Sequence, residues 1–326
     1  MLKKHLTASV LLLIVLTGAS CATKHDNAAG VEALSSTTPA IVKPITSDTS
    51  PTVEIEANTS PKGKATHGVF VYEGIIRTFD LYIPADMEDS APLIVNLHGY
   101  LAFSTSWMNS LNLNAAADKY GFAVCYPQGL SSGSTQFPGT AWNADFTFTN
   151  SDDVGFLTAL TVYLQEEYGF NPDATFGCGL SNGGFMCYTM AVRAPGVFKA
   201  IASVAGTVSA ASWEAVASAS PISILQIHGA LDTTVPMDGS MTTDGGWGGA
   251  PPISEILAKW AEIDGLTQRQ TVQSGTAAIT TYSSPESKYK IEFCLVANYG
   301  HNWPSSSNSG FDASEYILEF FSSLIE

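Results

Sequence analysis

The sequence predicts an α/β fold in which one mostly parallel sheet is covered by helices on both faces. Short apolar runs that are typical of buried strands alternate with longer segments that have helical apolar spacing. Strands are expected over residues 68–72, 77–83, 93–97, 122–126, 175–178, 200–204, 222–227 and 289–297. The clearest helices are expected over residues 154–168, 185–193, 253–263 and 314–324.

The order of these elements is that of the α/β-hydrolase fold in a single domain. The first two expected strands, 68–72 and 77–83, have no helix between them, so we expect them to pair as an antiparallel hairpin. In parallel sheets of this kind, ligands bind beyond the carboxyl ends of the strands. The segments that follow those ends are therefore where a functional site is expected.

Two pentapeptides match G-x-S-x-G, the pattern of a serine held on a sharp turn between a strand and a helix. Residues 179–183 contain Ser181, follow an expected strand and precede an expected helix. Residues 129–133 contain Ser131 and also follow a strand, but they lead into a loop rich in glycine and serine. Ser181 is therefore the predicted nucleophile, and Ser131 is the alternative.

A serine nucleophile needs a base to take its proton, and the base needs an orienting carboxylate. In this fold the carboxylate and then the histidine follow the serine along the chain. His301 stands on a loop after the last expected strand and is the predicted base, with an ordinary loop histidine as the alternative. His228 ends a strand, and we expect it to fix the next loop by hydrogen bonding rather than to act as the base.

Asp232 follows His228 by four residues and is the predicted orienting carboxylate. Asp238 and Asp244 lie further along the same region and compete for that role. A simpler interpretation of Asp232 is a turn or cap residue, because an aspartate before two threonines forms turns readily.

Ester hydrolysis also requires N–H donors for the oxyanion that forms on the attacked carbonyl. The backbone N–H of Asn182 is one predicted donor, because it follows the nucleophile at a helix N-terminus. The second donor is expected in the loop after strand 93–97, where the Tyr100 N–H is the first candidate and Leu101 the next. His98 is expected to shape this loop, and an ordinary strand-end turn is the alternative.

Tryptophans occur on several of the loops expected around the site. Trp107, Trp142, Trp247 and Trp303 are predicted to contact substrate, because indole rings suit sugars and aromatic groups. Core packing is the equally weighted alternative. The glycine-rich segment 245–249, which carries Trp247, is a candidate flap over the substrate.

The N-terminal residues predict export. Residues 1–20 read as a signal peptide, with Lys3 and Lys4 before an apolar run and small residues before Cys21. Acylation of Cys21 would make a bacterial lipoprotein at the cell surface or in the periplasm, and cleavage near Ala22 with soluble secretion is the alternative. Residues 21–66 are rich in Ser, Thr, Pro and Ala and predict a flexible tether. The enzyme domain is expected over residues 67–326.

Net charge and cysteine spacing limit which molecules and metal ions the protein is expected to bind. The formal net charge is −16, which argues against nucleic acid as a partner. Cys125, Cys178 and Cys294 lie in apolar runs, so with Cys187 they are expected to be buried free thiols. No pair has the C-x-x-C spacing of a metal site, so no zinc site is predicted.

Six blocks, in order along residues 67–326, resemble those of polyhydroxybutyrate depolymerase-like esterases, neighbours of the feruloyl and acetylxylan esterases of carbohydrate esterase family 1. The resemblance implies an α/β-hydrolase fold, a Ser181–Asp232–His301 triad, an ester substrate and no cofactor. Residues 100–103 (Tyr-Leu-Ala-Phe) depart from the polar or glycine-rich stretch expected after His-Gly. The matching blocks are residues 97–99, 126–129, 152–156, 179–186, 228–232 and 300–304.

The function predicted from these residues is hydrolysis of feruloyl or acetyl esters of polysaccharides through an acyl-enzyme intermediate. The alternative is a polyhydroxyalkanoate or other polyester depolymerase. A catalytically inactive glycan-binding lipoprotein is a third possibility, which the presence of all three triad residue types argues against. Membrane contact is expected only through a lipid on Cys21.

Overall fold

The computed structural model describes residues 62–325. The predicted signal peptide, Cys21 and most of the predicted tether therefore lie outside the described residues. The first strand, β1 (Lys64–Tyr72), begins before residue 67, where the sequence predicts the enzyme domain to start. Among residues 62–325 no helix has the length and apolarity needed to cross a membrane.

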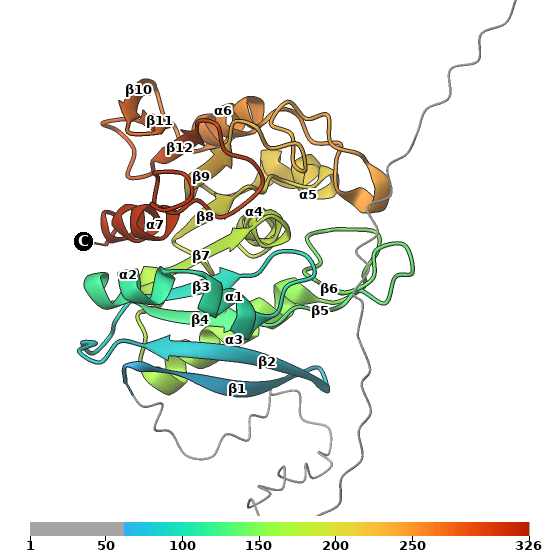
Figure 1. The fold of residues 1–326 in the computed structure, drawn as a ribbon, viewed down its shortest axis with the longest axis vertical. Coiled ribbons are helices and arrows are strands. Elements are labelled where there is room, and N and C mark those ends of the chain that lie inside the picture. The colour runs from blue at the N-terminus through green and yellow to red at the C-terminus, as the bar shows by residue number, and fades with distance from the viewer. Residues whose placement is uncertain (1–61, 326) are drawn as a thin grey trace, which may run out of the picture. The chain divides into compact units, whose positions relative to one another are not determined.

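Across the described part of the chain, ten strands form one sheet in the order β1-β2-β4-β3-β7-β8-β9-β12-β11-β10 (Figure 1). Its centre is parallel, and the hairpin of β1 and β2 (Ile75–Ile83) is antiparallel, as predicted. The α/β-hydrolase fold predicted from the sequence is thus confirmed. The parallel strands are β4 (Ala123–Pro127), β3 (Leu93–Leu97), β7 (Thr175–Leu180), β8 (Ala200–Val204), β9 (Ser223–Gly229) and β12 (Ile291–Val296).

The far edge of the sheet holds two strands that the sequence pattern did not predict, β11 (Ala277–Ser283) and β10 (Gln268–Ser274). Every residue of β10 is exposed. A strand with neither face buried needs no alternation of apolar and polar residues, so it leaves no period-two pattern to detect. A separate pair of two-residue strands, β5 (Leu130–Ser131) and β6 (Thr140–Ala141), lies outside this sheet.

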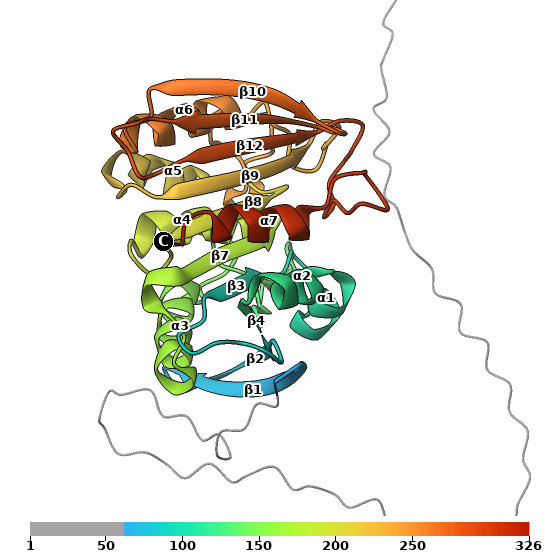
Figure 2. The same cartoon turned by 90° about the vertical axis from the view of Figure 1, so that its left-hand side faces the viewer.

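Helices cover both faces of the sheet (Figure 2). In β3, Leu93, Val95 and Leu97 pack into one core cluster and Ile94 packs into the other, so both faces of this strand are buried. The first cluster lies under α3 (Asp153–Tyr168), α4 (Asn182–Arg193) and α6 (Ile253–Ile263), and the second under α1 (Ser104–Ser110), α2 (Leu113–Tyr120) and α7 (Ala313–Ser322).

The helices confirmed from the sequence are α3, α4, α6 and α7, each longer than nine residues. Helices α1, α2 and α5 (Ala210–Ala215) have six to eight residues and were missed, because so short a segment shows little helical periodicity. The remaining helical segments are the short 3₁₀ turns Pro172–Ala174, Val216–Ser218 and Asp244–Gly246.

Four cysteines are buried free thiols, as expected: Cys125, Cys178, Cys187 and Cys294. Burial raises the pKa of each thiol, Cys178 to about 12. The thiols are therefore protonated at neutral pH and behave as small apolar side chains.

One buried carboxyl group, that of Asp264, has a hydrogen-bond partner on only one of its two oxygens. Asp264, at the C-terminal end of α6, accepts a hydrogen bond from the Ile222 N–H on Oδ1 (3.0 Å). Its Oδ2 is buried and has no hydrogen-bond partner within residues 62–325. Burial raises the pKa of Asp264 to about 7, against the opposing effect of the Ile222 N–H.

The raised pKa makes stability depend on pH with a definite sign. In the unfolded chain Asp264 ionises near its ordinary pKa of about 4. Between that pH and about 7 the folded state holds a proton that the unfolded state has lost, so stability falls as the pH rises. Each pKa unit corresponds to about 1.4 kcal/mol.

We predict that Asp264→Asn stabilises the protein above pH 7, because the amide keeps the Oδ1 acceptor and removes the buried charge. The gain is expected to be on the order of 4 kcal/mol at pH 8 and small at pH 4. Urea unfolding from pH 4 to 9 measures it, with the exposed Asp86→Asn as control. A gain that does not change with pH would contradict this account.

Candidate active site

Ser181 sits on the sharp turn between β7 and α4 that the motif predicts. Its φ is 52° and its ψ is −117°, a strained conformation for a residue with a Cβ. Its N–H donates to the Val204 carbonyl (2.8 Å), and its carbonyl accepts from the Phe185 N–H (2.9 Å). The turn is thus held by β8 on one side and by α4 on the other.

The glycines around Ser181 are required by close contacts with neighbouring backbone and side-chain atoms. A Cβ on Gly183 would lie 2.2 Å from the Leu97 carbonyl oxygen, at the end of β3. A Cβ on Gly179 would lie 2.6 Å from the backbone of Gly183, and one on Gly184 would lie 2.6 Å from Ser203 Oγ. The start of α4 therefore lies directly against the strand that leads into the His98 loop.

Three predicted residues meet at the carboxyl ends of the parallel strands. His301 Nε2 is 2.9 Å from Ser181 Oγ, and His301 Nδ1 is 2.8 Å from Asp232 Oδ2. Because an ionised carboxylate only accepts hydrogen bonds, Nδ1 carries the proton and Nε2 presents its lone pair to the serine hydroxyl. Ser131, the rejected alternative, instead lies in β5 and pairs with Thr140 of β6.

The Asp232 carboxylate is buried and surrounded by donors. Its Oδ1 accepts from the Thr234 and Val235 N–H groups, each at 2.9 Å. Burial opposes ionisation, but hydrogen bonds from His228, His301 and the Val235 N–H outweigh it and hold the pKa of Asp232 well below its usual range. Asp232 is therefore ionised at neutral pH.

The competing aspartates lie elsewhere on the surface. Asp238 is exposed, and its Oδ1 accepts from the Ser240 N–H (3.0 Å) in a local turn. Asp244 is also exposed and begins a 3₁₀ turn. Asp232 is the one of the three that is hydrogen-bonded to His301.

His98 holds the loop that was expected to supply the second oxyanion donor. Its Nε2 accepts from the Gly129 N–H (2.9 Å) and from Gln128 Nε2 (3.1 Å), and its Nδ1 donates to the Gly99 carbonyl (2.8 Å). Burial lowers the pKa of His98 to about 4. The ring is therefore neutral at physiological pH and acts as a fixed donor and acceptor within this loop.

Trp142 connects this loop to the nucleophile helix. Asn182 Oδ1 accepts from the Trp142 N–H (2.7 Å), and Asn182 Nδ2 donates to the Trp142 carbonyl (3.0 Å). The Trp142 indole N–H donates to the His98 carbonyl (3.0 Å). The two segments expected to supply oxyanion donors are thus fixed to each other through one tryptophan.

The backbone geometry separates the two candidates for the second donor. The Leu101 N–H already donates to the Thr140 carbonyl (2.9 Å). The Tyr100 N–H has no acceptor in the described part of the chain. The Asn182 N–H begins α4 and lacks an intrahelical partner. Asn182 and Tyr100 thus retain free N–H groups at the places predicted for the oxyanion donors.

The predicted contact of four tryptophans with substrate needs correction, because all four are buried: Trp107, Trp142, Trp247 and Trp303. Trp107 and Trp303 pack edge to face with ring centroids 5.5 Å apart. Trp303 follows His301 by two residues, and its indole N–H donates to Ser314 Oγ (3.1 Å). These contacts fix Trp303 in the protein interior, two residues after His301.

Trp247 packs against the loop that carries Tyr100. Its ring centroid is 4.1 Å from that of Phe146 and 5.9 Å from that of Tyr100. The Tyr100 hydroxyl donates to the Pro138 carbonyl (2.6 Å). The segment 245–249 is thus anchored by its tryptophan, which does not fit the expectation of a flap.

Three exposed apolar side chains lie on the loops that carry predicted site residues, and none of these side chains was expected to contact substrate. Leu101, Phe103 and Leu231 are 58%, 59% and 61% exposed. Leu231 immediately precedes Asp232, and its N–H donates to the Tyr299 carbonyl (2.8 Å), beside the His301 loop. The sequence signal was the apolar stretch 100–103, where a polar or glycine-rich stretch was expected. We call Leu101, Phe103 and Leu231 the apolar rim.

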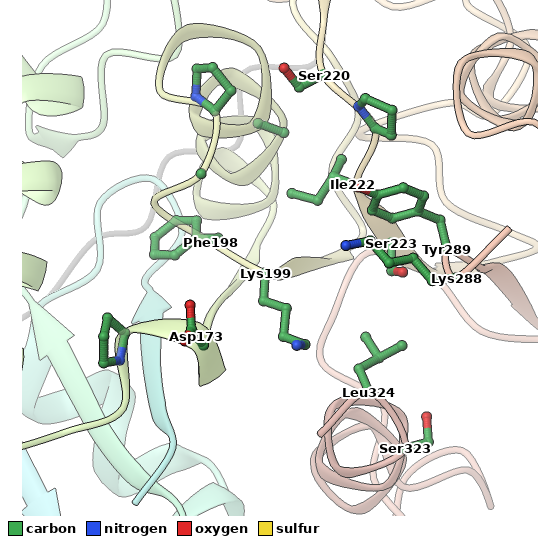
Figure 3. A pocket seen from close by; sticks show the side chains of 15 residues that line it. Asp173, Phe198, Lys199, Ser220, Ile222, Ser223, Lys288, Tyr289, Ser323 and Leu324 are labelled. Carbon is green, nitrogen blue, oxygen red and sulfur yellow. The ribbon is translucent and has the colours of Figure 1, made fainter. Parts of the chain in front are cut away.

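A cavity of about 450 Å³ lies at the other end of the sheet, near the amino ends of β7, β8 and β9. Lys199 and Lys288 extend toward it, and Phe198 and Tyr289 help to line it (Figure 3). The triad residues follow the carboxyl ends of strands, so this cavity is not part of the site. Among the described residues, no three His, Cys, Asp or Glu side chains are grouped to hold a metal ion.

Comparison with known proteins identifies related esterases. The family model described as esterase PHB depolymerase matches residues 77–242. The putative esterase NocK of Nocardia uniformis subsp. tsuyamanensis is 28% identical over 237 residues, which is 68% of each chain. Feruloyl esterase B of Neurospora crassa is 31% identical over 146 residues, which is 44% of this chain and 48% of that relative.

A third relative and two solved structures extend this comparison. The probable acetylxylan esterase A of Aspergillus fumigatus is 22% identical over 242 residues, 72% of this chain and 59% of its own. An acetyl xylan esterase from Aspergillus awamori has a TM-score of 0.55 at 16% identity, covering 76% and 94% of the two chains. An S-formylglutathione hydrolase from Agrobacterium tumefaciens has a TM-score of 0.57 at 14% identity, covering 83% and 99%. Both structures share the fold.

We predict that Gly183→Ala lowers stability by about 1–3 kcal/mol, because the new methyl would meet the Leu97 carbonyl oxygen at 2.2 Å. Displacing the start of α4 should also lower ester hydrolysis by roughly a hundred-fold. Thermal unfolding and initial rates measure both effects. Gly300→Ala is the control, because its Cβ would lie 3.8 Å from the nearest atom. Normal stability in Gly183→Ala would show that α4 can move away from β3 at no cost.

Proposed function

This chain belongs to the esterase PHB depolymerase family and is an esterase, and we propose that it cleaves its substrates through Ser181, His301 and Asp232. The observation that carries the proposal is the unbroken hydrogen-bonded chain from Ser181 Oγ through His301 to Asp232 Oδ2. This arrangement can remove a proton from a serine hydroxyl and return it to a leaving group, which is the chemistry of acyl transfer.

In the proposed reaction, Ser181 Oγ attacks the ester carbonyl carbon while His301 Nε2 takes the hydroxyl proton. The resulting imidazolium is stabilised by the ionised Asp232. When the tetrahedral intermediate collapses, the ester C–O bond breaks and His301 gives its proton to the departing alkoxide. A water molecule, activated by His301 in turn, then hydrolyses the acyl-serine and releases the carboxylic acid.

The negative oxygen of the tetrahedral intermediate would be bound by the N–H groups of Asn182 and Tyr100. Both are unpaired within the described residues, and the α4 dipole adds to the field at Asn182. Each such donor contributes on the order of 3 kcal/mol to transition-state stabilisation. The contacts through Trp142 and His98 keep the two donors fixed before substrate arrives.

For the substrate, we favour feruloyl or acetyl esters of polysaccharides. The relatives named feruloyl esterase and acetylxylan esterase support this class. The polyester alternative is favoured by a specific observation, the apolar rim of Leu101, Phe103 and Leu231. Exposed apolar groups around a site favour an apolar substrate surface. We further propose that the protein is exported and lipid-anchored through Cys21, as the residues before Cys21 suggest.

We predict that Ser181→Ala lowers hydrolysis of 4-nitrophenyl acetate at least about a thousand-fold, because the nucleophile is lost. Ser131→Ala should keep the parent rate. Initial rates measure both, and thermal unfolding should show that both variants fold. Activity retained in Ser181→Ala would overturn the proposed triad.

A substrate panel should separate the two substrate classes. It contains methyl ferulate, acetylated xylan and polyhydroxybutyrate film, each tested with the parent protein and with Ser181→Ala. We expect turnover of methyl ferulate or acetylated xylan, dependent on Ser181. Clearing of film without turnover of methyl ferulate or acetylated xylan would replace the polysaccharide proposal with the polyester one.

The apolar rim gives a separate prediction. If the rim contacts an apolar substrate surface, Phe103→Ser and Leu231→Ser should lower film clearing several-fold more than they lower hydrolysis of 4-nitrophenyl acetate. Val272→Ser is the matched control, because Val272 is also an exposed apolar residue but lies on the edge strand β10. Equal effects of all three substitutions would remove the apolar rim from substrate binding.

A further inference from the structure

Asp232 is contacted by a second histidine besides His301. His228 ends β9 and is buried. Its Nε2 lies 3.3 Å from Asp232 Oδ2, the same oxygen that accepts from His301 Nδ1. The proposed triad does not use His228, so its contact with this oxygen needs an explanation of its own.

The hydrogen-bond partners of His228 determine which of its ring nitrogens carries the proton, because one partner can only accept and the other can only donate. Its Nε2 is also 2.9 Å from the Val235 carbonyl, which can only accept, so Nε2 carries the proton. Its Nδ1 is 3.2 Å from Gln226 Nε2. An amide nitrogen only donates, so Nδ1 presents a lone pair and the ring is neutral.

The orientation of Gln226 is fixed in the same way. Its Nε2 also donates to the Gly206 carbonyl (2.9 Å), which excludes the flipped amide. Its Oε1 accepts from the Tyr188 hydroxyl (2.8 Å), and Tyr188 belongs to α4, the nucleophile helix. Gly206 lies against the elbow, because a Cβ there would be 2.7 Å from the Ser181 carbonyl oxygen.

We propose that Tyr188, Gln226 and His228 form a positioning relay, which joins the nucleophile helix to Asp232 and limits the negative charge that Asp232 offers to His301. All three side chains are buried. The relay fixes the Asp232 loop at two atoms, Asp232 Oδ2 and the Val235 carbonyl oxygen. The inference rests on the proposed triad, and it makes these residues positioning residues that do not touch the substrate.

The electrostatic part of the relay has a definite sign. Two N–H donors share Asp232 Oδ2, so each receives part of its negative charge. Without His228, more of that charge would stabilise the positive imidazolium that forms on His301 when it takes the serine proton. The titratable side chains hydrogen-bonded to Asp232 are His228 and His301, and burial keeps Tyr188, at the far end of the relay, a neutral donor by raising its pKa.

The test compares His228→Leu, which removes the donor, with His228→Gln, whose amide nitrogen can reach the place of Nε2. Rates on 4-nitrophenyl acetate are measured by pH-stat from pH 5 to 9, and kcat and KM are separated. Leu160→Ala in α3 is the control for lost stability, because Leu160 is buried and outside the relay.

For His228→Leu we expect kcat to fall about ten-fold or more with little change in KM. The acid limb of its kcat/KM profile should move up by roughly half a pH unit or more. His228→Gln should recover most of the rate and the parent profile. Leu160→Ala should unfold at a lower temperature without moving the profile.

A His228→Leu variant that loses stability but keeps the parent kcat and pH profile would overturn the relay, and so would a Gln variant no better than Leu. These outcomes differ from a failure of the triad. If Ser181→Ala keeps its activity, the proposed function fails first, whatever His228 does. If Ser181→Ala is inactive and His228→Leu behaves as the parent, only the relay fails.

Discussion

The close contact between the start of α4 and the end of β3 is the constraint on which the site depends. The contact exists because Gly183 has no side chain where the Leu97 carbonyl lies. It brings the start of α4, where the unpaired N–H of Asn182 lies, beside the loop that carries Tyr100. A larger residue at this point would push the start of α4 away from β3, and Ser181 would move with it because it is the N-cap of that helix.

The buried carboxylate of Asp232 is the second feature on which the geometry of the site depends. A carboxylate buried in this way would ordinarily take up a proton, yet it receives two backbone N–H groups on one oxygen and two histidines on the other. Its charge is therefore maintained by the loop that follows β9 and by His228 within that strand. The orientation of His301 follows from this charge, because the carboxylate decides which ring nitrogen carries the proton.

Much of this arrangement could be predicted from the sequence, and the exceptions have physical reasons. Ser181, Asp232 and His301 each follow a buried strand, and apolar runs make buried strands easy to recognise. Strand β10 could not be recognised, because all its residues are exposed. The burial of Trp142 could not be predicted either, because an indole on a loop is compatible with both substrate contact and a hydrogen bond to a carbonyl such as that of His98.

The burial of the tryptophans changes how substrate recognition should be viewed. Their buried rings pack and hydrogen-bond within the protein, so they present little surface to a substrate. Leu101 has a φ of 66°, a left-handed conformation that costs a non-glycine residue about 1–2 kcal/mol. A Cβ on Gly139 would lie 2.2 Å from the end of the Leu101 side chain, so that glycine makes room for the leucine. The left-handed backbone of Leu101 and the missing side chain of Gly139 together allow the leucine side chain to stay largely exposed next to Tyr100.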